Sequence, residues 1–252
     1  MNKKKIVYFG SGIVVALFSV MIYSFYFSSP SPFPSEEELI EEMTKVFPEA
    51  EVSQIREVID VTDREKFVPI VTKKDSYGKS FWVWDKYKWQ VTYIDMTGNP
   101  LIWKANEEDP STYHIVWNIH PDDQLKHIKF YMVRDRGYRT TEGTYETYYP
   151  RVQMDQTISL EKKSYGVMQI PKEWSVFITS LNNAQFVQQP DLFFTNFYSE
   201  QQVFYGWTPY GQDNKLSFPE NSVNGTGYSN GGVNTEHVMI LDENEIEIWK
   251  EE

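Results

Sequence analysis

A single apolar run near the N-terminus constrains this chain more than any other feature. The 22 residues from Ile6 to Phe27 contain no charged side chain. As a helix they would rise about 33 Å, which is enough to cross a hydrocarbon core of about 30 Å. The alternative is a cleaved signal peptide, but its apolar core is typically about 7–15 residues, and the bulky Tyr26–Phe27 pair makes a poor cleavage site. We therefore predict an uncleaved transmembrane helix over residues 6–27.

Basic and aromatic residues predict how this helix is oriented. Three basic residues precede the span: Lys3, Lys4 and Lys5. No further Lys or Arg occurs until Lys45, so the positive-inside rule places residues 1–5 in the cytoplasm and the remainder outside. Tyr23 and Tyr26 lie near the outer end of the span, where amphipathic rings favour the interface between lipid and water.

The region after the span is strongly acidic. Residues 28–252 hold all 36 Asp and Glu but 21 of the 24 Lys and Arg, a formal net charge of −15. Such a surface is repelled by nucleic-acid phosphates and by anionic lipids, which excludes nucleic acid as a partner. It favours an envelope protein with a basic face, because complementary charge steers association.

The chain has no cysteine, which excludes disulfides, thiolate metal sites and a cysteine nucleophile. Extracellular eukaryotic domains commonly use disulfides, so their absence favours a bacterial cell surface, and a Gram-positive one over a Gram-negative one.

The first part of the outer region is predicted to be a spacer followed by a helix. Residues 28–34, SSPSPFP, favour polyproline geometry and would lift the domain roughly 20 Å from the bilayer at about 3.1 Å per residue. Ser35 and Glu38 then form an S-x-x-E capping box, which is typical of a helix N-terminus. An apolar stripe at helical spacing follows: Leu39, Ile40, Met43, Val46 and Phe47.

Short runs rich in Val, Ile, Trp and Tyr come next, separated by turn residues. They predict an antiparallel meander with strands over 67–72, 80–84, 89–94 and 101–104. The helix and the meander together make an α+β unit over residues 35–105. In element order this unit, about 70 residues long, resembles the PepSY-type modules found on bacterial exteriors. The resemblance implies no particular residue role or activity.

After a polar linker, residues 112–252 are predicted to form a β-rich unit. Eight further runs have strand character: 113–119, 127–134, 151–159, 165–170, 174–181, 201–207, 237–241 and 245–249. Their number and spacing favour a β-sandwich or a distorted barrel. The fold class predicted for the chain is therefore α+β, mostly β. The long Asn-rich stretch 208–235 is expected to be either functional or disordered.

The stretch from Tyr113 to His127 is the best candidate for polar chemistry, with three of the four histidines. His114 and His120 would face the same side of a strand and, with Asp122, offer metal ligands. Residues 120–123 also read as a simple turn, and with no HExxH spacing the turn is favoured. A glycosidase requires a pair of acids, and the second unit offers Asp135, Glu142, Glu146 and Asp155, but in a chain with 36 acids chance proximity is the favoured explanation. No catalytic, cofactor or metal site is predicted.

Aromatic residues offer a binding alternative. Trp82, Trp84 and Trp89 lie on one hairpin, and they are either core residues or an exposed platform for carbohydrate. The core interpretation is favoured. Because GxSxG, SxxK, P-loop and Rossmann motifs are all absent, the function predicted is a non-enzymatic protein-interaction module of the cell envelope. The alternatives are an envelope hydrolase, with a site near His114, His120 and Asp122, and a carbohydrate-binding module. The sequence does not identify a small-molecule ligand.

Overall fold

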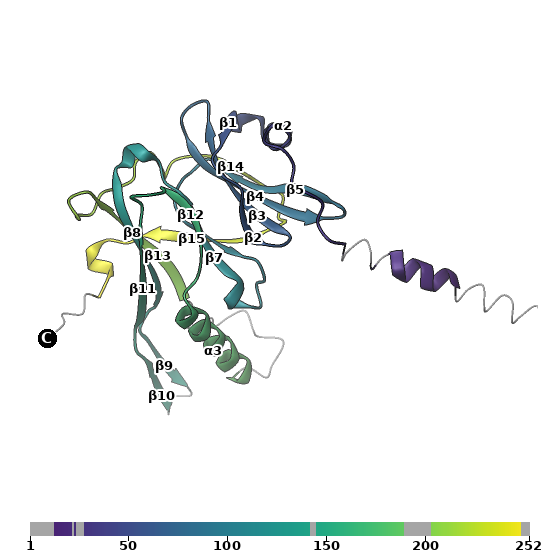
Figure 1. The fold of residues 1–252 in the computed structure, drawn as a ribbon. Helices are drawn as coiled ribbons and strands as arrows, with labels where there is room; N and C mark the ends of the chain where they lie inside the picture. The colour runs from purple at the N-terminus through teal and green to yellow at the C-terminus, as the bar shows by residue number, and fades with distance from the viewer. Residues whose placement is uncertain (1–12, 22, 24–27, 142–144, 189–202, 248–252) are drawn as a thin grey trace, which may run out of the picture.

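The computed structural model describes residues 13–21, 23, 28–141, 145–188 and 203–247 (Figure 1). This part of the chain is mostly β, with three α-helices, which confirms the predicted α+β, mostly β class. Its strands form two large sheets and a separate two-stranded hairpin.

Helix occupies residues 13–21 of the predicted span. Within the described residues, no helix is both long enough and apolar enough to cross a bilayer. Tyr23 is described and is exposed. The other residues used to predict the ends and the orientation of the span lie outside the described part: Lys3, Lys4, Lys5, Ile6, Tyr26 and Phe27.

The first large sheet has six strands in the order β1-β3-β4-β5-β14, with β2 also paired to β3. Its strands are β1 (Val52–Ile55), β2 (Ile59–Thr62), β3 (Glu65–Thr72), β4 (Tyr77–Asp85), β5 (Lys88–Asp95) and β14 (Gly227–Ser229). Helix α2 (Glu36–Val46) begins at the predicted capping box, in which Ser35 N–H donates to the Glu38 carboxylate at 2.8 Å. Leu39 and Met43 of α2 are buried against one face of this sheet, beside Trp82 and Val68.

The second large sheet has seven strands in the order β11-β8-β13-β15-β6-β7-β12. They are β6 (Leu101–Lys104), β7 (Tyr113–Asn118), β8 (Leu125–Arg134), β11 (Val152–Ser159), β12 (Tyr165–Gln169), β13 (Val203–Gly211) and β15 (Asn234–Ile240). All neighbours are antiparallel except β13 and β15, which are parallel. The hairpin of β9 (Gly137–Thr141) and β10 (Tyr145–Tyr149) extends beyond β8 and β11 (Figure 1). The second long helix of the domain is α3 (Lys172–Gln188).

Alternation along β3 and β4 explains how the two sheets pack. Alternate residues of a strand point to opposite faces of the sheet. Val68 and Trp82 face α2, whereas their neighbours Phe67 and Phe81 face the second sheet. There the Phe81 ring stacks on Trp103 with a centroid distance of 4.4 Å. Both faces of the first sheet are therefore covered, one by the helix and one by the second sheet.

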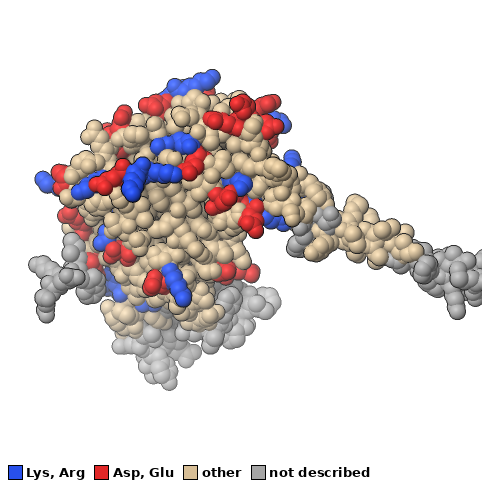
Figure 2. Space-filling view, viewed as in Figure 1, with Lys and Arg blue, Asp and Glu red and all other residues tan. Residues whose placement is uncertain are grey.

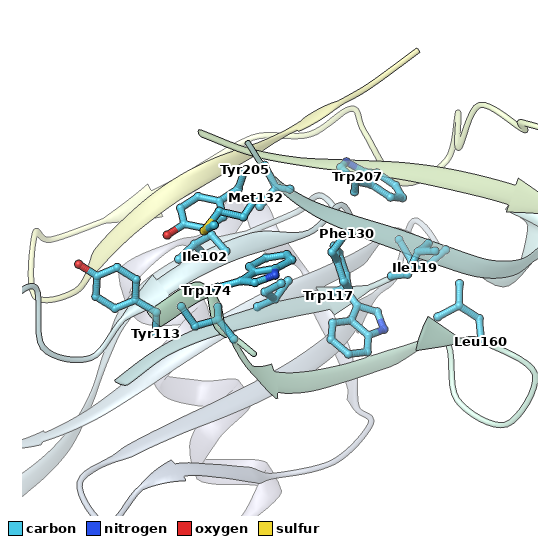
Figure 3. Close-up of a cluster of buried hydrophobic side chains, with 14 of the residues drawn as sticks. Ile102, Tyr113, Trp117, Ile119, Phe130, Met132, Leu160, Trp174, Tyr205 and Trp207 are labelled. Atoms are coloured by element: carbon cyan, nitrogen blue, oxygen red, sulfur yellow. The ribbon is translucent and has the colours of Figure 1, made fainter. Parts of the chain in front are cut away.

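The seven-stranded sheet curls around its own core, which contains aromatic residues of several strands (Figure 3). Trp117 from β7, Phe130 from β8 and Trp207 from β13 line this core, and Trp174 of α3 packs against it. The predicted second unit is therefore one curled sheet rather than a two-sheet sandwich. The face-to-face sheet packing in the molecule occurs between the two large sheets instead.

Four sequence-based assignments were wrong. Residues 101–104 do not close the first meander, because β6 pairs with β7 and β15 in the second sheet. Conversely, β14 crosses back from the C-terminal half to pair with β5, so the boundary near residue 105 does not separate the sheets. Residues 174–181 are helical because Trp174, Ile178 and Leu181 repeat at helical spacing and are buried. The predicted strand 245–249 does not begin at Glu245, which ends the 3₁₀ turn 243–245, and residues 248–249 lie outside the described part.

Candidate functional site

Two clusters of side chains at opposite ends of β4 are the candidates for function. The first, which we call the polar junction, joins the two large sheets. It consists of Lys79, Asn118, His120, Asp123 and Ser222, all of them buried. Because buried polar groups must be hydrogen-bonded, the partners of these side chains show what the cluster does.

Asn118 and Ser222 connect three parts of the chain. The Asn118 amide donates to the carbonyls of Ile70 and Gly78, at 3.0 and 2.7 Å, and so ties β7 to strands β3 and β4. The Ser222 hydroxyl donates to Asp123 at 2.5 Å and accepts from the His120 N–H at 2.9 Å. These bonds hold part of the Asn-rich stretch 208–235 against β7. That part is ordered in the structure, and nothing in these bonds requires a ligand.

Lys79 is fully buried within the same junction. Its ammonium group donates to the carbonyl oxygens of Thr97 and Asn99, at 2.8 and 2.5 Å, and lies 3.2 Å from the Asp95 carboxylate. Burial lowers the pKa of Lys79, and the Asp95 carboxylate opposes that change. With all its donors engaged, Lys79 is a structural cation and not a free base.

Among the described residues, one group of three side chains has metal-ligand geometry, with Asp75, His120 and Asp122 placing a ligand atom each within 4.8 Å of one another. The His120 ring is already engaged, however. Its Nδ1 accepts from the Asp122 N–H at 3.0 Å, and its Nε2 lies 2.9 Å from the Asp75 carbonyl, to which it donates. The ring therefore caps the 3₁₀ turn Pro121–Asp123, in agreement with the favoured turn interpretation.

The other predicted site residues are dispersed. His114 lies at the opposite end of β7 from His120, with its Nδ1 donating to the Thr112 carbonyl at 2.8 Å, and burial lowers its pKa. Asp135 and Asp155 each pair with a cation, Arg151 at 2.9 Å and Lys129 at 3.1 Å. Glu142 and the Glu146 side chain lie outside the described part. The structure does not bring His114 and His120 together.

The tryptophans considered as a carbohydrate platform are core residues. Trp82, Trp84 and Trp89 are 1%, 5% and 8% exposed. They pack beneath α2 and the segment before it. This result confirms the core interpretation of the hairpin.

The second candidate, the linker clamp, was not predicted. It consists of Phe33, Arg64, Lys66, Trp82 and Trp89. The Phe33 ring meets Trp89 edge-on at a centroid distance of 4.9 Å, and the Lys66 ammonium lies 5.4 Å from both ring centroids. Segment 28–34 is therefore held on the six-stranded sheet, which corrects the expectation of a stand-off spacer.

Side-chain donors also hold two backbone carbonyls of the same segment. The Arg64 guanidinium donates to the Ser28 carbonyl at 3.1 Å, and the Trp89 indole N–H donates to the Ser31 carbonyl at 3.0 Å. The pattern of prolines gave no indication of these contacts. The one local signal was Phe33 itself, an aromatic residue in an otherwise small and polar segment, whose burial stabilises the docked path.

An open polar pocket of about 570 Å³ lies beside β6 and β15. It is lined by Glu65, Lys104, Asn106 and Gly232 among others. Lys104 is neutralised by Glu236 at 2.6 Å, and burial raises the pKa of Glu65. These groups offer no unpaired cation and no nucleophile, so the pocket supports no particular chemistry.

Comparison of the chain with protein-family models, with curated proteins and with solved structures finds no match in any of the three.

Proposed function

We propose that the chain is a single-pass membrane protein that displays its acidic β-rich domain on the extracytoplasmic side. The observation that carries the anchoring is the helix at residues 13–21. Its large apolar side chains are between 47% and 65% exposed, so they bury little surface within the chain. Figure 2 draws this helix without a charged side chain. A helix that is apolar on every side requires an apolar environment, and a bilayer supplies one.

The distribution of charge supports the orientation. Lys3, Lys4 and Lys5 precede the apolar run, whereas no basic residue follows it until Lys45. The positive-inside bias therefore favours a cytoplasmic N-terminus.

We further propose that the domain is a non-enzymatic interaction module of the cell envelope, with a basic-faced protein as its partner. Its formal charge of −15 would steer such a partner toward it. The hydrolase alternative has less support because both ring nitrogens of His120 are engaged in holding the turn. The carbohydrate alternative has less support because Trp82, Trp84 and Trp89 are buried.

Cysteine labelling tests the topology cleanly, because the chain has no cysteine of its own. Lys215→Cys places a thiol on an exposed loop after β13, and Asn2→Cys places one before the apolar run. In intact cells, a membrane-impermeant maleimide should label Lys215→Cys and should label Asn2→Cys only after lysis. The reverse labelling pattern, or extraction of the protein by alkaline carbonate, would overturn the anchored topology.

Crosslinking in intact cells tests the partner. A membrane-impermeant amine crosslinker should capture an envelope protein, and capture should fall as salt rises, since the Debye length shrinks from about 10 Å at 0.1 M to about 3 Å at 1 M. Capture that is indifferent to salt would contradict a partner chosen by charge.

A further inference from the structure

We infer that the membrane-proximal end of the six-stranded sheet, where strands β4 and β5 are joined, is a surface that binds anionic phospholipid headgroups. The surface consists of Arg64 and the β4–β5 turn, Lys86, Tyr87 and Lys88. This inference rests on the anchoring proposed above. Binding at this surface would fix the orientation of the domain relative to the bilayer, whereas a flexible linker alone would not.

The path of the chain places this end of the sheet at the membrane. The apolar run ends at Phe27, and the carbonyl of the very next residue, Ser28, accepts from Arg64 at 3.1 Å. One residue spans at most about 3.6 Å, whereas the headgroup layer on each side of a bilayer is roughly 5–8 Å deep. Arg64 therefore lies at headgroup depth when residues 6–27 span the membrane.

The β4–β5 turn lies beside Arg64. The Trp84 N–H donates to the Arg64 carbonyl at 2.8 Å, and the next pair along the hairpin, Asp85 and Lys88, closes the turn. Segment 28–34 reaches the domain at this end of the sheet (Figure 1). Lys86, Tyr87 and Lys88 are all exposed there, Tyr87 at 47%.

Backbone strain at the turn points to a requirement for these side chains. Lys86 and Tyr87 form a two-residue turn with φ of 50° and 63°, the left-handed conformation that suits Asn-Gly. Side chains such as Lys and Tyr raise the free energy of that conformation. Lys86 and Tyr87 occupy this conformation all the same, and such a backbone outlier is the kind of feature that motivates a functional hypothesis for the turn.

The chemistry of the turn matches a lipid headgroup layer. Lys86 and Lys88 can meet lipid phosphates, and a Tyr ring is favoured at the interface. Asp85 lies 3.4 Å from Lys86, but both side chains are about half exposed, so the ion pair is weak and can be exchanged for phosphate. The turn carries one net positive charge on a domain that is otherwise strongly acidic.

Headgroup quenching in vesicles tests the orientation. The full chain would be reconstituted in phosphatidylcholine vesicles, with or without phosphatidylglycerol, that contain a nitroxide on the lipid headgroup. A fluorophore on Asp63→Cys, in the exposed turn before β3, should be quenched at least twofold more than one on Lys73→Cys. Lys73 is the matched control because it lies at the far end of the same strands, roughly 30 Å away.

A turn variant tests the lipid contact itself. Phosphatidylglycerol should increase quenching at residue 63, and the double variant Lys86→Asn/Tyr87→Gly should abolish that increase while raising the melting temperature by about 4 °C. The control Lys73→Asn/Lys74→Asn removes two positive charges from the far end and should leave the increase intact.

The outcomes separate the two proposals. If the chain does not float with vesicles, the anchoring fails and the lipid surface fails with it. If the chain floats but residues 63 and 73 are quenched equally, only the fixed orientation is overturned. A turn variant that keeps the phosphatidylglycerol-dependent increase overturns the role of Lys86 and Tyr87. A turn variant that melts at a lower temperature overturns the argument from strain.

Discussion

The two ends of strand β4 are built on different physical principles. At the end away from segment 28–34, the polar junction buries Lys79, Asn118 and Ser222 completely and gives each a set of short hydrogen bonds. At the other end, the linker clamp holds the chain with ring edges and a cation over aromatic faces, as in the contact of Lys66 with Phe33. Beside the clamp, the β4–β5 turn keeps a conformation that its residues disfavour.

Hydrogen bonds in a buried network are directional, and each unmet partner carries a desolvation penalty. Such a network specifies one angle between the two sheets. Aromatic and cation–π contacts are less directional and individually weaker, so they secure a segment without dictating a single geometry. The comparison indicates that the polar junction maintains the fold, whereas the clamp end positions the domain for function.

The largest expected effect comes from removing the buried cation. Lys79→Met leaves the Asp95 carboxylate and the carbonyls of Thr97 and Asn99 without their donor in a dry site. Breaking a buried ion pair in this way costs about 3–5 kcal/mol. Denaturant unfolding should show that loss in the free energy of unfolding.

The matching change at the clamp end is Lys66→Met. Lys66 also pairs with an acid, Asp60, but that carboxylate is 75% exposed, so the expected loss is about 1 kcal/mol or less. Equal losses for Lys79→Met and Lys66→Met would remove the distinction between the two ends.

Local signals explain what the sequence could predict. The capping box of Ser35 and Glu38 and the stripe that follows it are contained within a dozen residues, and α2 formed as expected. The strands β3, β4, β5, β7 and β8 were likewise found from short apolar runs. Helix α3 was missed because Val176, Ile178 and Thr179 suggest a strand by composition, although the buried positions repeat at helical spacing.

Long-range contacts explain what the sequence could not predict. The bond from Ser222 to Asp123 joins residues 99 apart, and the bond from Asn118 to Ile70 joins residues 48 apart. The prediction of a polar turn at residues 120–123 is confirmed, but no local pattern marks its hydrogen-bond partners in the loop after β13. The linker clamp likewise depends on Trp89, 58 residues from Ser31.

An effect smaller than that of Lys79→Met is expected from opening the clamp. Phe33→Ala removes the ring that contacts Trp82 and Trp89, at centroid distances of 5.8 and 4.9 Å. Because Phe33 is only half-buried, the loss should be about 1–2 kcal/mol, below the 3–5 kcal/mol of a fully buried Phe. Limited proteolysis should cut within residues 28–34 faster in this variant. The exposed neighbour Pro32→Ala is the control and should change neither measurement; if both variants are cut at the same rate, the segment is not clamped.

The smallest effect concerns pH and lies at the far end of β7 from the polar junction. Burial lowers the pKa of His114 below its ordinary value of 6.5, so below that pH the unfolded chain binds a proton that the folded chain does not. Stability should therefore fall as pH drops from 6.5 toward the lowered pKa, by less than about 1 kcal/mol because the ring is partly solvated.

His114→Asn keeps a donor for the Thr112 carbonyl but cannot titrate, so its stability should be flatter with pH over that window. Burial also lowers the pKa of His127, so His127→Asn should remove a second contribution from the same side of pH 6.5. Parallel curves for the wild type and His114→Asn would contradict a titrating His114. They would assign the acid sensitivity of the fold to groups other than His114.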